Sequence, residues 1–64
     1  MLKYYAVKAD DGHDYFEYAF KIDERRLEEF DTLEQMAKCC YNGFKRHFCI
    51  LSVTEIDDEY YQCF

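Results

Sequence analysis

The side chains best suited to chemistry are two histidines and four cysteines. His47 and Cys49 are two residues apart, so on a β-strand they face the same side, close enough to share a metal ion or a proton. A catalytic Cys–His pair also needs a third group that orients the imidazole, and the sequence identifies none. Structural zinc sites repeat a pair of closely spaced ligands, whereas Cys39 and Cys40 are adjacent and Cys63 stands alone. We therefore expect no cofactor, and a Cys/His metal site is the less favoured alternative.

The aspartates of residues 10–14 form the second group with chemical potential. Carboxylates suit divalent cations, but this segment lacks the spaced ligands and the terminal Glu of a calcium loop. Its Asp11-Gly12 pair is instead typical of a hairpin turn. The chain has no glycine-rich phosphate loop, because Gly12 and Gly43 are its only glycines, and its one serine, Ser52, has no nucleophile-elbow sequence around it. We therefore predict that the protein is not an enzyme.

The start of the chain and the cysteines together indicate a compartment. Lys8 and Asp10 interrupt the first apolar run before it reaches the length of a secretory signal. No run approaches the ~20 apolar residues of a membrane span. We expect a cytoplasmic protein without membrane contact, whose cysteines stay reduced and act as small buried hydrophobic side chains.

Residues 2–9 and 15–22 predict two β-strands joined by the Asp-Gly turn. The first segment is rich in Tyr and Val, which favour strands. In the second, apolar residues alternate with polar ones, which is typical of a half-buried strand. The alternation places four side chains on one face: Phe16, Tyr18, Phe20 and Ile22.

The segment between the hairpin and Gly43 has neither Gly nor Pro, and its apolar residues recur at helical spacing. Asp31 followed by Glu34 has the spacing of a capping box, which predicts that a helix begins immediately after Asp31. Two versions stay open: one long helix from about residue 24, or a short turn at 24–30 and a main helix at 32–42. Gly43 is the expected helix terminator.

Residues 47–56 are rich in β-branched side chains and predict a third strand. An acidic turn at 57–59 follows, and residues 60–64 form an optional short fourth strand. The sequence therefore predicts a single α+β domain over residues 1–64. Its expected fold is a small antiparallel sheet in the order β-β-α-β, with one helix packed on one face.

Charge is distributed unevenly along the chain. Fourteen acidic residues oppose eight basic ones, giving a net charge of −6. The acids concentrate at residues 10–34 and 55–59, whereas residues 36–50 hold three bases and no acid. This balance argues against direct binding to nucleic acid. The acids can imitate phosphates or steer the chain to a basic protein surface, or they can simply keep a small protein in solution.

Aromatic residues are abundant, with seven tyrosines and six phenylalanines. One helix covers only one face of a sheet, yet the first and third predicted strands have apolar residues on both faces. The second face then needs a cover: a second copy, a partner, or the C-terminal segment 60–64. Tyrosine suits an interface because it buries a ring and keeps a hydroxyl for hydrogen bonding.

Two segments carry a resemblance to known proteins: residues 30–37 (Phe-Asp-Thr-Leu-Glu-Gln-Met-Ala) and residues 48–54 (Phe-Cys-Ile-Leu-Ser-Val-Thr). This layout resembles small acidic phage-encoded inhibitors of host proteins, of the type of the coliphage transcription inhibitor that docks on host RNA polymerase. Anti-CRISPR proteins share the same small, acidic and compact profile. The resemblance implies a stoichiometric binder that inhibits or redirects a larger protein, and it assigns no role to a single residue.

We therefore expect a non-enzymatic protein-binding module, encoded by a phage or mobile element, that docks on a basic or nucleic-acid-binding surface of a host protein and occludes it. The partner would be a protein such as a nucleic-acid-processing enzyme. The expected contacts are exposed acids and aromatic anchors: Asp10, Asp11, Asp14, Glu28, Glu29, Asp57, Asp58, Glu59, Tyr4, Tyr15, Tyr60 and Tyr61. The alternative is a structural homodimer or an accessory subunit without an inhibitory role.

Overall fold

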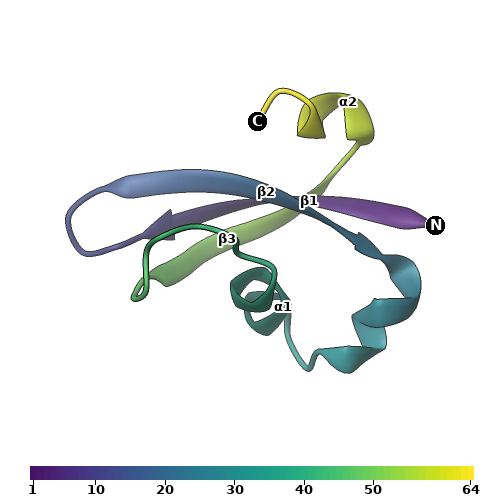
Figure 1. Ribbon diagram of the computed structural model, residues 1–64, viewed down its shortest axis with the longest axis horizontal. Helices are drawn as coiled ribbons and strands as arrows, with labels where there is room; N and C mark the ends of the chain where they lie inside the picture. Colours follow the sequence, from purple (N-terminus) through teal and green to yellow (C-terminus); the bar gives the residue numbers. More distant parts are fainter.

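The computed structural model describes residues 1–64 and contains a three-stranded antiparallel sheet with short helices on both sides (Figure 1). The strand order is β2-β1-β3, so the first strand is central. The strands are β1 (Leu2–Asp10), β2 (Tyr15–Asp23) and β3 (Cys49–Ile56). The helices are the 3-10 helix η1 (Glu24–Glu29), α1 (Leu33–Cys39) and α2 (Asp58–Tyr61). The α+β class and the antiparallel sheet agree with the prediction.

The predicted β1–β2 hairpin is confirmed, with the two strands paired without interruption. Gly12 has a φ of 96° and is the only residue in the left-handed region. Oδ1 of Asp10 accepts a hydrogen bond from the Gly12 amide at 2.8 Å. Oδ1 of Asp11 accepts from the amides of His13 and Asp14, both at 2.9 Å. The connection is thus a loop held by two carboxylates rather than a tight two-residue turn.

The segment before α1 takes the shorter of the two predicted forms, because η1 is separate from α1. The helix cap lies one residue later than predicted. Oγ1 of Thr32 accepts a hydrogen bond from the Gln35 amide at 3.1 Å, and Oε1 of Gln35 accepts from the Asp31 amide at 2.8 Å. Thr32 and Gln35 therefore form the reciprocal cap that the sequence assigned to Asp31 and Glu34.

Helix α1 ends at Cys39, earlier than the predicted end at residue 42. Gly43 does not terminate it: the capping residue is Cys40, with a φ of −91°, and Gly43 has no positive φ. The ring of Tyr41 instead packs on Tyr18 of the sheet at a centroid distance of 4.9 Å. The residue that follows the helix cap thus contributes its ring to the packing on the sheet.

The core lies between α1 and one face of the sheet. It contains six buried side chains: Tyr5, Val7, Phe20, Ile22, Met36 and Ala37. The hydroxyl of Tyr18 donates to the Ala37 carbonyl at 2.6 Å and joins the sheet to the helix. Burial raises the pKa of Tyr18 to about 12. Only 7 of 64 residues are buried, so much apolar surface faces the solvent.

Strand β3 begins at Cys49 rather than at residue 47, and it contains a bulge. Lys8 pairs with Ser52, but the next residue of β1 pairs with Ile50, so Leu51 is the extra residue. Ile50 and Val53 consequently both pack against the core, whereas simple alternation placed them on opposite faces. The bulge brings two apolar side chains to one face and leaves Leu51 54% exposed.

The predicted fourth strand is absent, and the C-terminal segment forms α2 instead. Oδ1 of Asp57 accepts a hydrogen bond from the Tyr60 amide at 2.8 Å and caps this helix. The ring of Tyr61 packs on Tyr4 at a centroid distance of 5.1 Å. The sequence left three candidates to cover the second face of the sheet: a second copy, a partner or the C-terminal segment. In the structure the C-terminal segment, as α2, lies on this face (Figure 1).

The cysteines differ from their predicted environment. All four thiols are free, but Cys39, Cys49 and Cys63 are exposed and only Cys40 is half-buried. Helix α1 turns Met36, Ala37 and Cys40 toward the sheet, so Cys39 lies on its outer side. Burial raises the pKa of the Cys40 thiol. No helix of the chain has the length and apolar character needed to cross a membrane.

Candidate functional site

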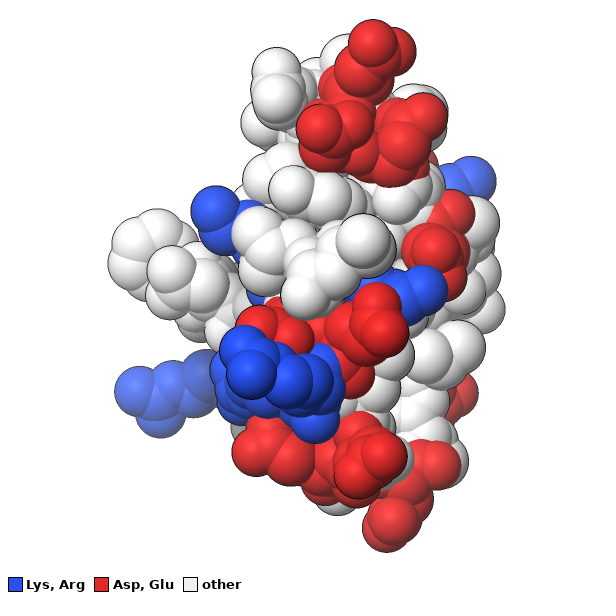
Figure 2. Space-filling model, turned by 90° about the vertical axis from the view of Figure 1, so that its right-hand side faces the viewer, with Lys and Arg blue, Asp and Glu red and all other residues white.

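The predicted acidic contacts fall into three separate groups. Asp10, Asp11 and Asp14 lie at the hairpin turn, at one end of a molecule whose longest extent is 36 Å (Figure 1). The acids of η1 and those of α2 lie toward the other end. Figure 2 shows red side chains at the top and at the bottom of this face, with further red side chains and blue ones interspersed between them. The hairpin acids therefore lie apart from those of η1 and α2 (Figure 1).

The carboxylates of the hairpin mostly serve the fold. Asp11 forms an ion pair with Lys45, which lies far along the chain. Hydrogen bonds from Lys45 and from the amides of Asp14 and His13 hold the pKa of Asp11 well below its usual range. The Lys45 ammonium also lies over the ring of Phe16, 5.1 Å from its centroid. Asp14 alone among the three hairpin aspartates has a side chain without a hydrogen-bond or ion-pair partner.

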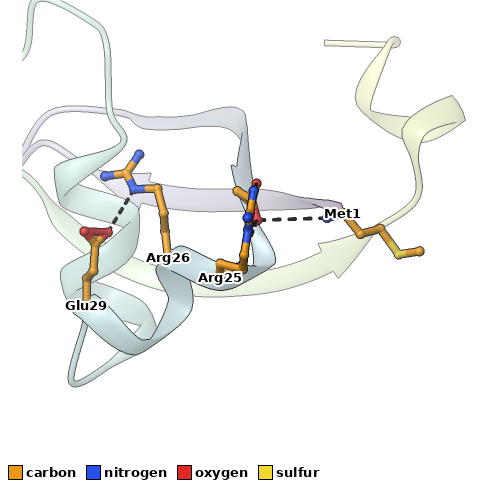
Figure 3. Close-up of polar contacts among 5 residues, drawn as sticks. Met1, Arg25, Arg26 and Glu29 are labelled. Carbon is orange, nitrogen blue, oxygen red and sulfur yellow. Dashed lines mark hydrogen bonds and ion pairs between the residues drawn. The ribbon is translucent and has the colours of Figure 1, made fainter.

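The acids near η1 are partly neutralised by the arginines beside them (Figure 3). Nε of Arg26 donates to Oε2 of Glu29 at 2.9 Å. Arg25 donates to Oδ2 of Asp23 at 3.1 Å, and the N-terminal ammonium lies 3.9 Å from Oδ1 of the same carboxylate. Hydrogen bonds from Arg25 lower the pKa of Asp23 to about 2. Glu28 has no ion pair.

Two acids of α2 have no ion pair. Asp57 caps the helix, but Asp58 and Glu59 form no ion pair with any residue of the chain. Directly after them, Tyr60 is 54% and Phe64 is 51% exposed, with ring centroids 5.6 Å apart. We call these four residues, Asp58, Glu59, Tyr60 and Phe64, the C-terminal patch. It combines free negative charge with exposed aromatic area.

Three open hollows adjoin the C-terminal patch, and Tyr60 lines two of them. The first, of about 450 Å³, lies between Tyr60 and the end of β3, at Glu55, Ile56 and Asp57. The second, of about 390 Å³, lies between the patch and the second face of the sheet. Its floor consists mainly of small and polar side chains: Ala6, Lys8, Glu17, Ser52 and Thr54. The patch therefore stands above the sheet with space on either side for an incoming side chain.

The four predicted tyrosine anchors divide into two kinds. Tyr4 and Tyr61 are half-buried and stack on each other. Tyr15 is 78% exposed at the start of β2, and Tyr60 belongs to the C-terminal patch. Two of the predicted anchors are thus accessible, at opposite ends of the molecule, and two hold α2 against the sheet.

Sequence reasoning missed one large exposed side chain and gave little weight to another. The helical spacing of apolar residues continues to Phe44, but this residue follows the actual helix end and is fully exposed. Phe64 belongs to the C-terminal segment, and aromatic residues are enriched in interfaces. The exposure of Phe44 was not predictable from helical spacing, because α1 stops at Cys39.

The His47–Cys49 pair borders a hollow of about 330 Å³ beside the hairpin turn. Its lining includes two acidic and two basic side chains: Asp10, Asp11, Lys38 and Arg46. No group of three His, Cys, Asp or Glu side chains converges here or elsewhere in the structure. The hollow thus offers mixed charge but no assembled set of metal ligands.

No protein-family model matches this chain, and no curated protein or solved structure matches it either.

Proposed function

We propose that the chain is a protein-binding module that docks on a basic surface of a partner protein through its C-terminal patch. The observation that carries this proposal is the placement of Asp58 and Glu59, both without an ion pair, next to the exposed rings of Tyr60 and Phe64. Ion pairs occupy Asp11 and Glu29 elsewhere in the molecule, whereas the patch combines two acids without an ion pair with two exposed aromatic rings.

The two kinds of side chain in the patch have different tasks in such a contact. Exposed carboxylates attract a basic surface over several ångströms and raise the association rate. Aromatic side chains bury large areas and typically supply much of the binding energy at the centre of an interface. The hollows beside Tyr60 give long basic side chains of the partner a place to lie.

Occlusion is the effect that such a module has on a larger protein. A basic surface that normally binds nucleic acid is blocked when an acidic module occupies it, and no catalysis by the module is needed. A phage-encoded inhibitor of a host nucleic-acid enzyme is the form of this function that the sequence resemblance implies.

The test compares capture of partner proteins from a bacterial lysate by the wild-type chain and two variants of equal charge. The first variant, Asp58→Asn with Glu59→Gln, neutralises the patch. The second, Asp14→Asn with Glu28→Gln, neutralises two unpaired acids outside it. We expect a specific protein, identified by mass spectrometry, to bind the wild-type chain and the second variant but not the first. Equal capture by all three, or binding that is unchanged by added salt, would contradict the electrostatic part of the proposal.

The aromatic part has its own comparison. Tyr60→Ala removes a ring of the patch, whereas Tyr15→Ala removes a more exposed ring at the hairpin. We expect Tyr60→Ala to weaken binding of the captured partner by about tenfold or more, as for an interface anchor. Tyr15→Ala should leave the affinity unchanged. A larger loss of affinity for Tyr15→Ala than for Tyr60→Ala would indicate that the partner binds at the hairpin instead.

A further inference from the structure

The outer edge of β3 has no hydrogen-bond partner within the chain. The strand order places β3 at the edge of the sheet. None of the backbone hydrogen bonds outside the helices and strands involves residues 49–56, and no side chain bonds to their backbone. An unpaired edge is a template for pairing with another strand, because its amides and carbonyls still need partners.

The register identifies which residues present their backbone groups outward. The Glu24 amide donates to the Met1 carbonyl at 2.9 Å, which extends the β1–β2 ladder by one pair. Because hydrogen-bonded and non-bonded pairs alternate in antiparallel sheets, odd-numbered residues of β1 bond to β2 and even-numbered ones to β3. Ser52 pairs with Lys8, an even-numbered residue, so its backbone groups bond to β1. The same holds for Thr54 and Ile56, which pair with Ala6 and Tyr4. Val53 and Glu55 direct their amides and carbonyls to the free edge.

Strand β3 lacks the usual protection of an exposed edge. It contains no Pro and no Lys, and its only charged residue, Glu55, is paired with Lys3 at 3.6 Å. The bulge at Leu51 interrupts the edge near one end and leaves Ser52–Ile56 as a regular stretch. The other sheet edge, on β2, carries both Glu17 and Lys21. The β3 edge is thus the better template.

Charges on either side of β3 favour one occupant of this edge. Arg46 lies shortly before the strand, is exposed and has no ion pair. Asp58 and Glu59 lie shortly after the strand and are also unpaired. When two copies of β3 pair antiparallel, the beginning of each strand lies beside the end of the other. Opposite charges then face each other twice, whereas parallel pairing would bring like charges together.

We propose that the chain forms a symmetric dimer in which two β3 edges pair antiparallel and produce a continuous six-stranded sheet. In this dimer Arg46 of each protomer lies near Asp58 of the partner subunit. A two-fold axis requires a self-complementary surface, and a strand with a basic start and an acidic end meets that requirement. The inference goes beyond the proposed function, because it needs no second protein and leaves the aromatic rings of the C-terminal patch uncovered.

Backbone pairing is tested by sedimentation of the purified chain over a range of concentrations. Glu55→Pro removes an outward amide without removing an inward one, and Glu55→Gln is the matched control that changes only the charge. We expect the wild-type chain and Glu55→Gln to reach twice the monomer mass, and Glu55→Pro to stay monomeric with an unchanged circular dichroism spectrum. A wild-type chain that remains monomeric at the highest concentration would overturn the proposal.

The charge pairing is tested by reversing it. Arg46→Glu alone and Asp58→Arg alone each place like charges together, and we expect each to weaken the dimer by about tenfold or more. The double variant exchanges the two signs and should restore dimerisation. Failure of this rescue refutes the antiparallel arrangement. Arg46→Glu leaves the residues of the C-terminal patch unchanged. If this variant no longer dimerises but still captures the partner, the dimer and the proposed function are independent of each other.

Discussion

Tyr18 connects the two layers of the core through one hydrogen bond. Its hydroxyl donates to the Ala37 carbonyl of α1 at 2.6 Å, and its ring packs on Phe20 of the same strand and on Tyr41 after the helix. This hydrogen bond adds a polar contact to the apolar packing of Met36 and Ala37 on the sheet. The side chain combines apolar burial with a satisfied polar atom.

We predict that Tyr18→Phe lowers the free energy of unfolding by about 1 kcal/mol, because the Ala37 carbonyl loses its hydrogen-bond partner while the ring stays in place. Denaturant unfolding followed by circular dichroism measures this change. Tyr15→Phe is the control, since that side chain is exposed and its hydroxyl has no partner in the chain. Equal stability of the two variants would show that the hydrogen bond contributes nothing net.

At the scale of the elements, the N-cap of α1 shows how a local signal can be displaced by one residue. Asp31-x-x-Glu34 and Thr32-x-x-Gln35 are overlapping capping boxes, and sequence alone does not rank them. In the structure Oγ1 of Thr32 accepts the cap hydrogen bond from the Gln35 amide, and Oε1 of Gln35 accepts one from the Asp31 amide. Helix α1 has only seven residues, so it depends on this cap more than a long helix does.

We predict that Thr32→Ala lowers the free energy of unfolding by about 1 kcal/mol, as expected for the loss of an N-cap. Asp31→Ala is the matched control, because the Asp31 side chain makes no hydrogen bond to the helix. Thermal unfolding of both variants gives the comparison. If Asp31→Ala lowered the stability more than Thr32→Ala, Asp31 rather than Thr32 would be the N-cap residue.

The elements that were predictable are those set by local signals. Asp11-Gly12 and the alternation around Phe20 specify the hairpin without help from the rest of the chain. Helix α1 ends earlier than predicted, and Tyr41 beyond its end packs on Tyr18, a contact between segments far apart in the sequence that local signals do not reveal. The C-terminal segment forms α2 in place of the optional fourth strand, and Asp57 provides the N-cap of this helix.

The candidate site was predictable only in part, for the same reason. Acid-rich segments are visible in the sequence, but whether an acid is free depends on its partners in space. Lys45, 34 residues further along the chain, forms an ion pair with Asp11. No basic side chain forms an ion pair with Asp58. The unpaired edge of β3 was likewise not visible, because it follows from the strand order β2-β1-β3.

At the scale of the whole molecule, two carboxylates join segments that are distant in sequence or structure. Asp11 connects the hairpin to the loop that contains Lys45, and Asp23 connects the end of β2 to the chain start and to Arg25. Hydrogen bonds from Lys45 and Arg25, respectively, lower the pKa values of these two aspartates. Both contribute stability that depends on their ionised state.

We predict that the melting temperature is steady from neutral pH to about pH 5 and falls between about pH 4 and pH 2. The pKa of Asp23 is about 2 in the folded chain and about 3.9 in an unfolded one. The unfolded state therefore binds the proton first, and stability is lost as the pH falls through this interval. Calorimetry should show that the melting temperature of Asp23→Asn falls less over this pH interval than that of the wild-type chain. Glu28→Gln changes an unpaired acid, and its melting temperature should fall as much as that of the wild-type chain. An unchanged acid transition in Asp23→Asn would remove Asp23 as its source.

The buried phenol of Tyr18 also has an optical consequence. The chain has seven tyrosines and no tryptophan, so its near-ultraviolet absorbance comes mainly from phenol rings. Burial raises the pKa of Tyr18 to about 12, and it raises the pKa of Tyr5 as well. In strong base these two rings become tyrosinate later than an ordinary phenol does, and unfolding removes the delay. The late part of the alkaline absorbance change is therefore a label-free gauge of how many molecules keep α1 docked on the sheet.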